Sequence, residues 1–245
     1  MISYKERQYL CWFLSVPGIG AVTGMRLFKQ YKSFEEIYNI EGKNLENAGL
    51  LRAKEAAAFD AEKCQLDRRK RELEELEKEP FDTVLDCGCG TGPAIELLHE
   101  KYPEKHFTGL DLTPEMIHVA QEKKLSNTTF VVGDCENIPF PENSFDAIIS
   151  SNSFHHYPNP QDFFNSAYRV LKKGGRLILR DYTSKSSLLL WLCNHIEMPL
   201  AHLCGHGDVR MYSGAEFRKF AENAGFEVVS FEAQKKMRAH LVARK

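Results

Sequence analysis

The 245-residue sequence lacks an excess of charge of either sign, because 32 Lys and Arg stand against 34 Asp and Glu. Residues 1–80 and 81–245 are each close to neutral too, so total charge does not indicate a nucleic-acid partner. Long apolar runs are also lacking. The most apolar stretch, 188–204, is interrupted by Asn194, His195, Glu197 and His202, which excludes a membrane-spanning helix there.

The seven cysteines lack regular spacing. Their number is odd, and they form neither a disulfide framework nor a C-x-x-C zinc pattern. Cys87 and Cys89 lie in a glycine turn that requires small side chains, so we expect no metal there. Lys5, Glu6 and Arg7 precede any apolar run, so we expect no signal peptide. Together these features predict reduced thiols and a cytoplasmic location.

The most informative stretch is 83–92, where a short apolar strand runs into an acid and then a glycine-rich turn. Asp86 stands two residues before the first of three alternating glycines, Gly88, Gly90 and Gly92, and a helix pattern follows at once. Glycine has no Cβ, so such a turn lets backbone N–H groups approach a nucleotide-like ligand closely. The spacing G-x-G-x-G differs from the dinucleotide pattern G-x-G-x-x-G.

Strand and helix patterns alternate after this turn, which predicts a Rossmann-like α/β fold with a parallel sheet. Strands are expected at 83–85, 106–110, 130–133, 145–150 and 176–180, with a closing antiparallel pair at 226–231 and 240–243. Thr113 is an expected helix N-cap. Ser213 and Glu216 form an expected capping box, and Gly225 is expected to end that helix.

Polar residues follow several of these strands, at the sheet edge where α/β proteins bind ligands. Asp111 lies 19 residues after Gly92 and can accept both hydroxyls of a ribose, and Asp134 can accept an adenine amino proton. With the glycine turn, these residues resemble class I S-adenosylmethionine (SAM) dependent methyltransferases over about residues 81–245. The resemblance implies SAM as cofactor, bound by Asp86, Cys87, Gly88, Gly90, Gly92, Asp111, Leu112, Asp134, Cys135 and Ser151.

Other nucleotides remain alternatives at this point. NAD fits less well, because the glycine spacing differs and two acids, not one, mark the nucleoside. Methyl transfer needs a general base only when the acceptor atom carries a poorly acidic proton. Candidates for that role follow the fourth and fifth strands: His155, His156 and Asp181. The two histidines also fit a plain structural role in the wall of the site.

The acceptor site is expected to involve His156, Tyr182, His206, Asp208, Arg210 and Tyr212. The apolar region 188–203 follows the fifth strand, where such enzymes place a substrate-covering insertion, and it suggests a small, partly apolar acceptor. Amino-group DNA methyltransferases carry (N/D)-P-P-(Y/F) after the fourth strand. This chain has Ser151-Asn152-Ser153-Phe154 there instead, which excludes that class.

The first 60 residues predict a small all-α domain with a helix-hairpin-helix around Val16-Pro17-Gly18-Ile19-Gly20. Gly18 and Gly20 expose amides that can hold a phosphate, and Arg26 can add a contact. Alternatively, the hairpin is an ordinary helix–helix turn. Together with 33–37 and 45–51, it resembles the N-terminal domain of the DNA-processing protein A family, over about residues 5–79. That family's activity does not carry over, because a different domain follows.

A charged helical connector is expected at 61–80, and the methyltransferase-like domain at 81–245. Class I methyltransferases usually have one or two helices before the first strand that help to cover SAM. Here either the helix 52–79 replaces them or they are missing, so we expect weakened SAM affinity. Two functions remain: a small-molecule methyltransferase with an appended helical module, and a DNA-binding adaptor whose second half is a scaffold or SAM sensor.

Overall fold

The computed structural model describes Tyr9, Phe13, Val16, Ile19 and residues 21–31, 33–197, 209–234 and 237–245. The chain divides into two compact units, Met1–Glu74 and Glu75–Lys245. The sequence placed the boundary near Pro80. Within the described residues, no helix is both long enough and apolar enough to cross a membrane.

The described elements of the first unit are all helices: α2 (Ala21–Tyr31), α3 (Phe34–Tyr38), α4 (Gly42–Asn47) and most of α5 (Ala53–Leu76). Their core includes Leu27, Ile37, Leu45 and Phe59, which are fully buried. The Ser33 hydroxyl caps α3 by accepting the Glu36 N–H at 3.0 Å. In a full capping box the Ser33 N–H would also donate to the Glu36 side chain. Here that N–H donates to Tyr31 O at 2.8 Å instead.

The predicted DNA-contacting hairpin is only partly visible. Gly18 and Gly20 lie outside the described residues. Arg26, the third predicted phosphate contact, donates from Nη2 to the Leu50 carbonyl at 2.5 Å. Its guanidinium therefore already has a backbone partner within the helical unit.

The second unit contains a seven-stranded sheet in the order β3-β2-β1-β4-β5-β7-β6. Its strands are β1 (Thr83–Cys87), β2 (His106–Asp111), β3 (Thr128–Val132), β4 (Phe145–Ser151), β5 (Leu171–Tyr182), β6 (Glu227–Gln234) and β7 (Arg238–Arg244). Strands β1 to β5 pair in parallel, and β7 pairs antiparallel with both β5 and β6. The predicted α/β sheet with an antiparallel closing pair is confirmed.

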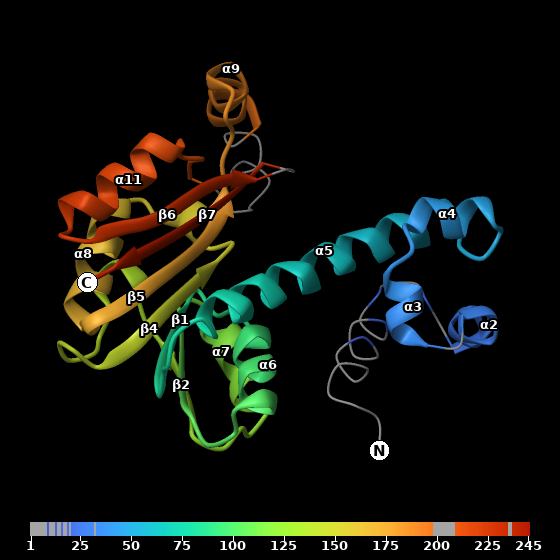
Figure 1. Ribbon diagram of the computed structural model, residues 1–245, viewed down its shortest axis with the longest axis horizontal. Coiled ribbons are helices and arrows are strands. Elements are labelled where there is room, and N and C mark those ends of the chain that lie inside the picture. Colours follow the sequence, from blue (N-terminus) through green and yellow to red (C-terminus); the bar gives the residue numbers. More distant parts are fainter. Residues whose placement is uncertain are drawn as a thin grey trace. The chain divides into compact units, whose positions relative to one another are not determined.

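Helices cover both faces of this sheet (Figure 1). Helices α6 (Pro93–Lys101) and α7 (Pro114–Gln121) lie on one face, and α8 (Pro160–Val170) and α11 (Gly214–Asn223) lie on the other. The change of face occurs between β1 and β4, where the strand order reverses. In open α/β sheets the carboxyl ends of the strands beside such a reversal form the ligand site.

Several predicted element ends are reproduced. Ser213 and Glu216 form the expected capping box at the start of α11, and Gly225 ends it with φ of 99°. Thr113 is the N-cap of α7, but its side chain makes no capping bond. Its N–H instead donates to Asp111 Oδ1 at 2.9 Å. The fifth strand begins at Leu171, earlier than the predicted start at 176.

The core between the sheet and helices α8 and α11 centres on Phe154, which is fully buried. Phe154 lies in a short 3₁₀ turn, Phe154–His156, directly after β4. Its ring meets those of Tyr157, Phe163, Phe164, Tyr212, Phe217 and Phe220 at centroid distances of 5.1–6.4 Å. Such aromatic packing fixes the segment after β4 firmly in place.

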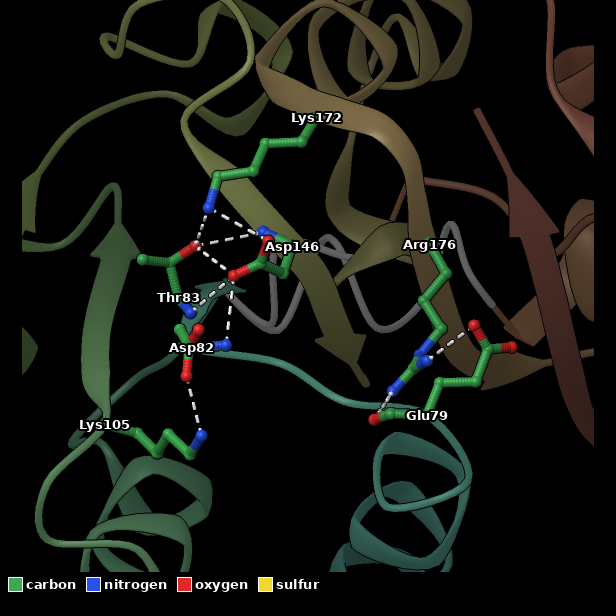
Figure 2. A network of polar contacts seen from close by, with 7 residues as sticks. All are labelled: Glu79, Asp82, Thr83, Lys105, Asp146, Lys172 and Arg176. Atoms are coloured by element: carbon green, nitrogen blue, oxygen red, sulfur yellow. Dashed lines mark hydrogen bonds and ion pairs between the residues drawn. The ribbon is translucent and has the colours of Figure 1, made fainter.

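A polar network joins the amino ends of β1 and β4 (Figure 2). Asp146 Oδ2 accepts the N–H groups of Asp82 and Thr83 at 3.0 and 2.9 Å. Lys172 Nζ lies 2.9 Å from Asp146 Oδ1. Burial raises the pKa of Asp146, but the bonds from Lys172, Asp82 and Thr83 outweigh it and lower the pKa to about 2. The carboxylate therefore stabilises this edge of the sheet.

The end of α5 is held at the same edge. The Arg176 guanidinium pairs with Glu79 Oε2 at 3.1 Å and donates to the Glu79 carbonyl at 2.9 Å. Arg244 on β7 binds the same carboxylate and is the main cause of its lowered pKa. Glu79 thus meets the sheet at the amino end of β5, whereas Glu75 lies 3.6 Å from His240, which pairs with Arg180 further along β5.

Candidate active site

The glycine turn after β1 has the conformation that its sequence requires. Gly88, Gly90 and Gly92 all have positive φ, at 73°, 54° and 73°. A Cβ on Gly88 would lie 2.3 Å from Ser153 Cβ, so the chain after β4 packs directly on the turn. A Cβ on Gly90 would meet nothing within 4 Å. The turn is therefore closed against the protein at Gly88 and open at Gly90.

The Asp111 carboxylate lies beside this open position. Its Oδ2 accepts the Gly90 N–H at 2.8 Å, and its Oδ1 accepts the Thr113 N–H at 2.9 Å. The end of β2 and the glycine turn are also joined by the N–H groups of Gly88 and Cys89, which donate to Leu110 O. Leu112 follows with 69% of its surface exposed. A fixed carboxylate next to an exposed apolar side chain suits a ribose and its attached base.

Asp134 and Cys135 stand at the end of β3. Asp134 is exposed and accepts the Glu136 N–H at 2.8 Å, which begins a short 3₁₀ turn, Cys135–Asn137. Cys87, Cys89 and Cys135 are buried free thiols. Burial raises the pKa values of Cys87 and Cys89 far above that of an ordinary thiol, so both are protonated at neutral pH.

Ser153 connects the end of β4 to the glycine turn. Its hydroxyl donates to Cys87 O at 3.0 Å, lies 3.0 Å from Ser150 Oγ, and accepts the Tyr157 hydroxyl at 3.1 Å. Burial raises the pKa of Tyr157 well above its ordinary value, so Tyr157 remains a neutral donor. This arrangement places the residues after β4 next to the predicted cofactor turn.

His155 and Asp181 form a buried pair at the ends of β4 and β5. His155 Nδ1 lies 2.8 Å from Asp181 Oδ1. The N–H groups of Phe154 and Tyr182 donate to the same carboxylate at 2.8 and 2.6 Å. These bonds hold Asp181 and thereby orient the imidazole. His156 and Tyr182 both pack on the His155 ring, at centroid distances of 4.0 and 5.0 Å.

The residues after β5 pack beside Tyr182. Helix α9 (Ser187–Leu192) continues into a π-helical turn, Cys193–Glu197. Asn194 in that turn exchanges two hydrogen bonds with the Met211 backbone, at 2.9 and 2.8 Å. Cys193 and Met211 are buried with Tyr182, Leu190 and Met237 packed against them. One side of α9 is therefore attached directly to Tyr182.

The other predicted acceptor-site residues lie in different settings. Tyr212 is buried in the Phe154 core, where its carbonyl accepts the Thr183 hydroxyl at 2.8 Å. Arg210 pairs with Glu216 at 2.7 Å, and its N–H donates to His155 O at 3.2 Å. His206 and Asp208 lie outside the described residues, as do positions 198–203 of the apolar region.

Two residues of this region were missed by sequence reasoning. Arg238, at the start of β7, donates from Nη1 to Asn152 Oδ1 at 2.7 Å. Asn152 is held in the left-handed region, with φ of 53°. Neither residue belongs to a spaced motif, and 86 positions separate them. They meet because β7 pairs antiparallel with β5 and begins beside the ends of β4 and β5.

The residues at the switch point, the place between β1 and β4 where the strand order reverses, fit SAM. The open position at Gly90 and the oriented Asp111 carboxylate provide space and hydrogen-bond acceptors for a nucleoside. Asp86, at the end of β1, is almost fully buried next to the turn. Fold and constellation together define a class I methyltransferase domain.

Comparisons with known proteins agree with this class. A family model described as "Methyltransferase domain" matches residues 85–179. Demethylmenaquinone methyltransferase of Thermotoga maritima is 39% identical over 111 residues, which are 45% of this chain and 48% of that protein. The ubiquinone/menaquinone biosynthesis C-methyltransferase UbiE of Rhizobium johnstonii is 33% identical over 168 residues, which are 64% of this chain and 65% of that protein.

The fold has solved counterparts. A crystal structure of a putative methyltransferase from Bacillus halodurans covers 71% of this chain and 99% of its own, with a TM-score of 0.60 and 22% identity. The chain spans about half to two thirds of the two curated relatives. The second unit contains a SAM-dependent methyltransferase domain. None of these comparisons supports a helix-hairpin-helix or a DNA-processing relationship for the first unit.

Proposed function

We propose that the protein transfers the methyl group of SAM to a small-molecule acceptor that is partly apolar. The observation that carries this proposal is the Gly90–Asp111 pair at the switch point of the sheet, with a 2.8 Å bond between the Gly90 N–H and the carboxylate. Bound SAM supplies an electrophilic methyl group on a sulfonium. The protein's part is to position the acceptor and exclude water.

Two observations support an apolar acceptor. The relatives in Thermotoga and Rhizobium are named for demethylmenaquinone and for ubiquinone and menaquinone biosynthesis. Helix α9 and its π-helical turn expose Leu188, Trp191 and Ile196, with 67, 52 and 50% of their surfaces accessible. Their neighbours on the same segment pack against Tyr182. An apolar acceptor that reached Tyr182 would pass along this segment.

His155 and Asp181 are the proposed proton-handling pair. The Asp181 carboxylate accepts the Nδ1–H of His155 and so fixes the ring orientation. The proposal assigns proton transfer from an acceptor hydroxyl or carbon acid to Nε2, the ring nitrogen that does not face Asp181. Asp181 itself is 1% exposed and already accepts backbone bonds, so its role is to orient His155.

The test is SAM binding by calorimetry with the wild type and Asp111→Asn, followed by a methyl-transfer screen with radiolabelled SAM. Asn keeps the size but loses one acceptor and the charge, so we expect about tenfold weaker binding or more. We also expect the wild type to bind more weakly than micromolar, since Glu79, just before β1, is anchored at the amino end of the sheet. Wild-type affinity in Asp111→Asn, or no SAM binding at all, would refute the proposal.

The DNA-binding adaptor remains a separate proposal for the helical unit. Total charge does not favour it, and Arg26 already donates to Leu50 O. Salt-dependent DNA binding that is lost on replacing Gly18 and Gly20 would support it. Methyl turnover would exclude the version in which the second unit is only a scaffold.

A further inference from the structure

Arg238 lies at the carboxyl end of the parallel strands, where the acceptor is proposed to bind. It is the first residue of β7 and pairs in register with Tyr182, the last residue of β5. Its guanidinium lies over the Tyr182 ring, 3.8 Å from the ring centroid, and its Nη1 donates to Asn152 Oδ1 at 2.7 Å. The side chain is thus fixed between the ends of β4 and β5.

No carboxylate pairs with this guanidinium within the described part of the chain, where its hydrogen-bond partner is the neutral Asn152 amide. Its Nε is buried without a hydrogen-bond partner, as are the Nε atoms of Arg176 and Arg180. Arg176 and Arg244, on the same two strands, both pair with Glu79, and Arg210 pairs with Glu216. A half-buried charge without a counterion, and a buried donor without an acceptor, each cost free energy.

The free donors of Arg238 have a definite geometry. Asn152 takes Nη1, which leaves Nε–H and the Nη2 hydrogens. The Nε and Nη2 donors share one edge of the planar guanidinium, and this edge matches the two oxygens of a carboxylate. Tyr182 holds the guanidinium by a cation–π contact, with Cζ 3.8 Å from the ring centroid.

Arg238 is also connected to the methyl-transfer region. Asn152 precedes Ser153, whose hydroxyl donates to Cys87 O beside the glycine turn. The Asn152 N–H donates to Arg180 O at 2.9 Å, which fixes its backbone between β4 and β5. On the other side, Tyr182 packs against His155. Arg238 is therefore linked through Asn152 to the segment beside the cofactor turn and through Tyr182 to the His155–Asp181 pair.

We propose that Arg238 binds a carboxylate of the acceptor, so that the substrate is a small organic acid with an apolar body. This inference rests on the proposed function, because it assigns the acceptor to the same site. The acceptor carboxylate supplies the missing counterion and satisfies the donors of the Nε edge. Asn152 acts as a positioning residue, since it contacts the guanidinium and not the acceptor.

The test uses 2-naphthoate as a probe, with 2-naphthylmethanol as its neutral counterpart of similar shape. Binding is measured by calorimetry with and without saturating S-adenosylhomocysteine. We expect 2-naphthoate to bind the wild type at least tenfold more tightly than Arg238→Gln, with Arg238→Lys in between. The neutral probe should bind all three proteins equally. Asn152→Gly, which tolerates the positive φ, should weaken naphthoate binding by a smaller factor.

Arg218→Gln is the matched control, because Arg218 also lies over an aromatic ring, 5.5 Å from the Phe231 centroid, but on α11. Its naphthoate affinity should equal that of the wild type. Circular dichroism melting of each variant separates lost binding from lost folding. The proposal is overturned if the wild type does not prefer naphthoate to the alcohol, or if Arg238→Gln binds naphthoate as the wild type does. Failure to bind S-adenosylhomocysteine would refute the proposed function instead. The two failures are distinguishable, because naphthoate binding is also measured in the absence of S-adenosylhomocysteine.

Discussion

The glycine turn allows a matched pair of substitutions to separate folding from cofactor binding. Gly88→Ala and Gly90→Ala each add one methyl group to the same turn, at positions with φ of 73° and 54°. Both changes place an L side chain in the left-handed region, which costs about 1–2 kcal/mol. The two positions differ in what the new methyl group meets.

At Gly88 the added Cβ would lie 2.3 Å from Ser153 Cβ and 2.5 Å from its Oγ. Overpacking of this kind costs about 1–3 kcal/mol, so Gly88→Ala should lose about 2–5 kcal/mol of stability in all. At Gly90 the added Cβ meets nothing within 4 Å, so only the backbone strain applies. In the proposed complex SAM occupies the open space around that Cβ, where a steric penalty of about 1–3 kcal/mol would weaken SAM binding roughly 5- to 150-fold.

Urea unfolding and SAM calorimetry on the same preparations measure both effects. We expect Gly90→Ala to fold with a small loss of stability and to bind SAM poorly, and Gly88→Ala to be the less stable protein. Wild-type SAM affinity in Gly90→Ala would refute the placement of the cofactor beside Asp111. Equal stability of the two variants would refute the close packing of Ser153 on the turn.

Two further predictions concern other parts of the domain. Asp146 has a pKa of about 2 in the fold against an ordinary value of 3.8, so its carboxylate stabilises the fold fully above pH 3.8 and this stabilisation is lost as the pH falls through 2. After allowance for its partial exposure, Asp146→Asn should lose about 1–2 kcal/mol at pH 7. Urea unfolding should show this gap narrowing below pH 4, and a gap that does not change with pH would contradict the charge argument. Trp191→Ser on α9 should raise KM for apolar acceptors about threefold or more, with the equally exposed Val229→Ser on β6 as control, and an equal effect of both would remove α9 from the acceptor path.

Local spacing in the sequence predicted which residues of the candidate cofactor site lie close together. The glycine turn and Asp111 lie within one strand–helix–strand unit, so their spacing alone indicated that they meet, and the Gly90–Asp111 bond joins them. Glycine at positive φ and acids after apolar strands are local signals. The strand pattern was recovered for the same reason, apart from the early start of β5 at Leu171.

The acceptor side depends on contacts that local patterns do not encode. His155 and Asp181 were each candidates, but their 2.8 Å contact arises because β4 and β5 are neighbours in the sheet. Arg238 gave no signal, since a single arginine on the closing strand looks like an ordinary exposed residue. Its importance appears only when β7 pairs antiparallel with β5 and brings it over Tyr182.

The network around Asp146 and the ion pairs of Glu79 with Arg176 and Arg244 lie at the edge of the sheet opposite Asp111 and Arg238. The polar contacts that hold the strand starts therefore lie at one margin of the sheet, and the residues proposed to bind ligands lie at the other. Substitutions at Lys172 or Arg176 can change how firmly the strands are held without touching a ligand. Substitutions at the carboxyl edge can change which acceptor binds, while the contacts at the amino edge continue to hold the strands together.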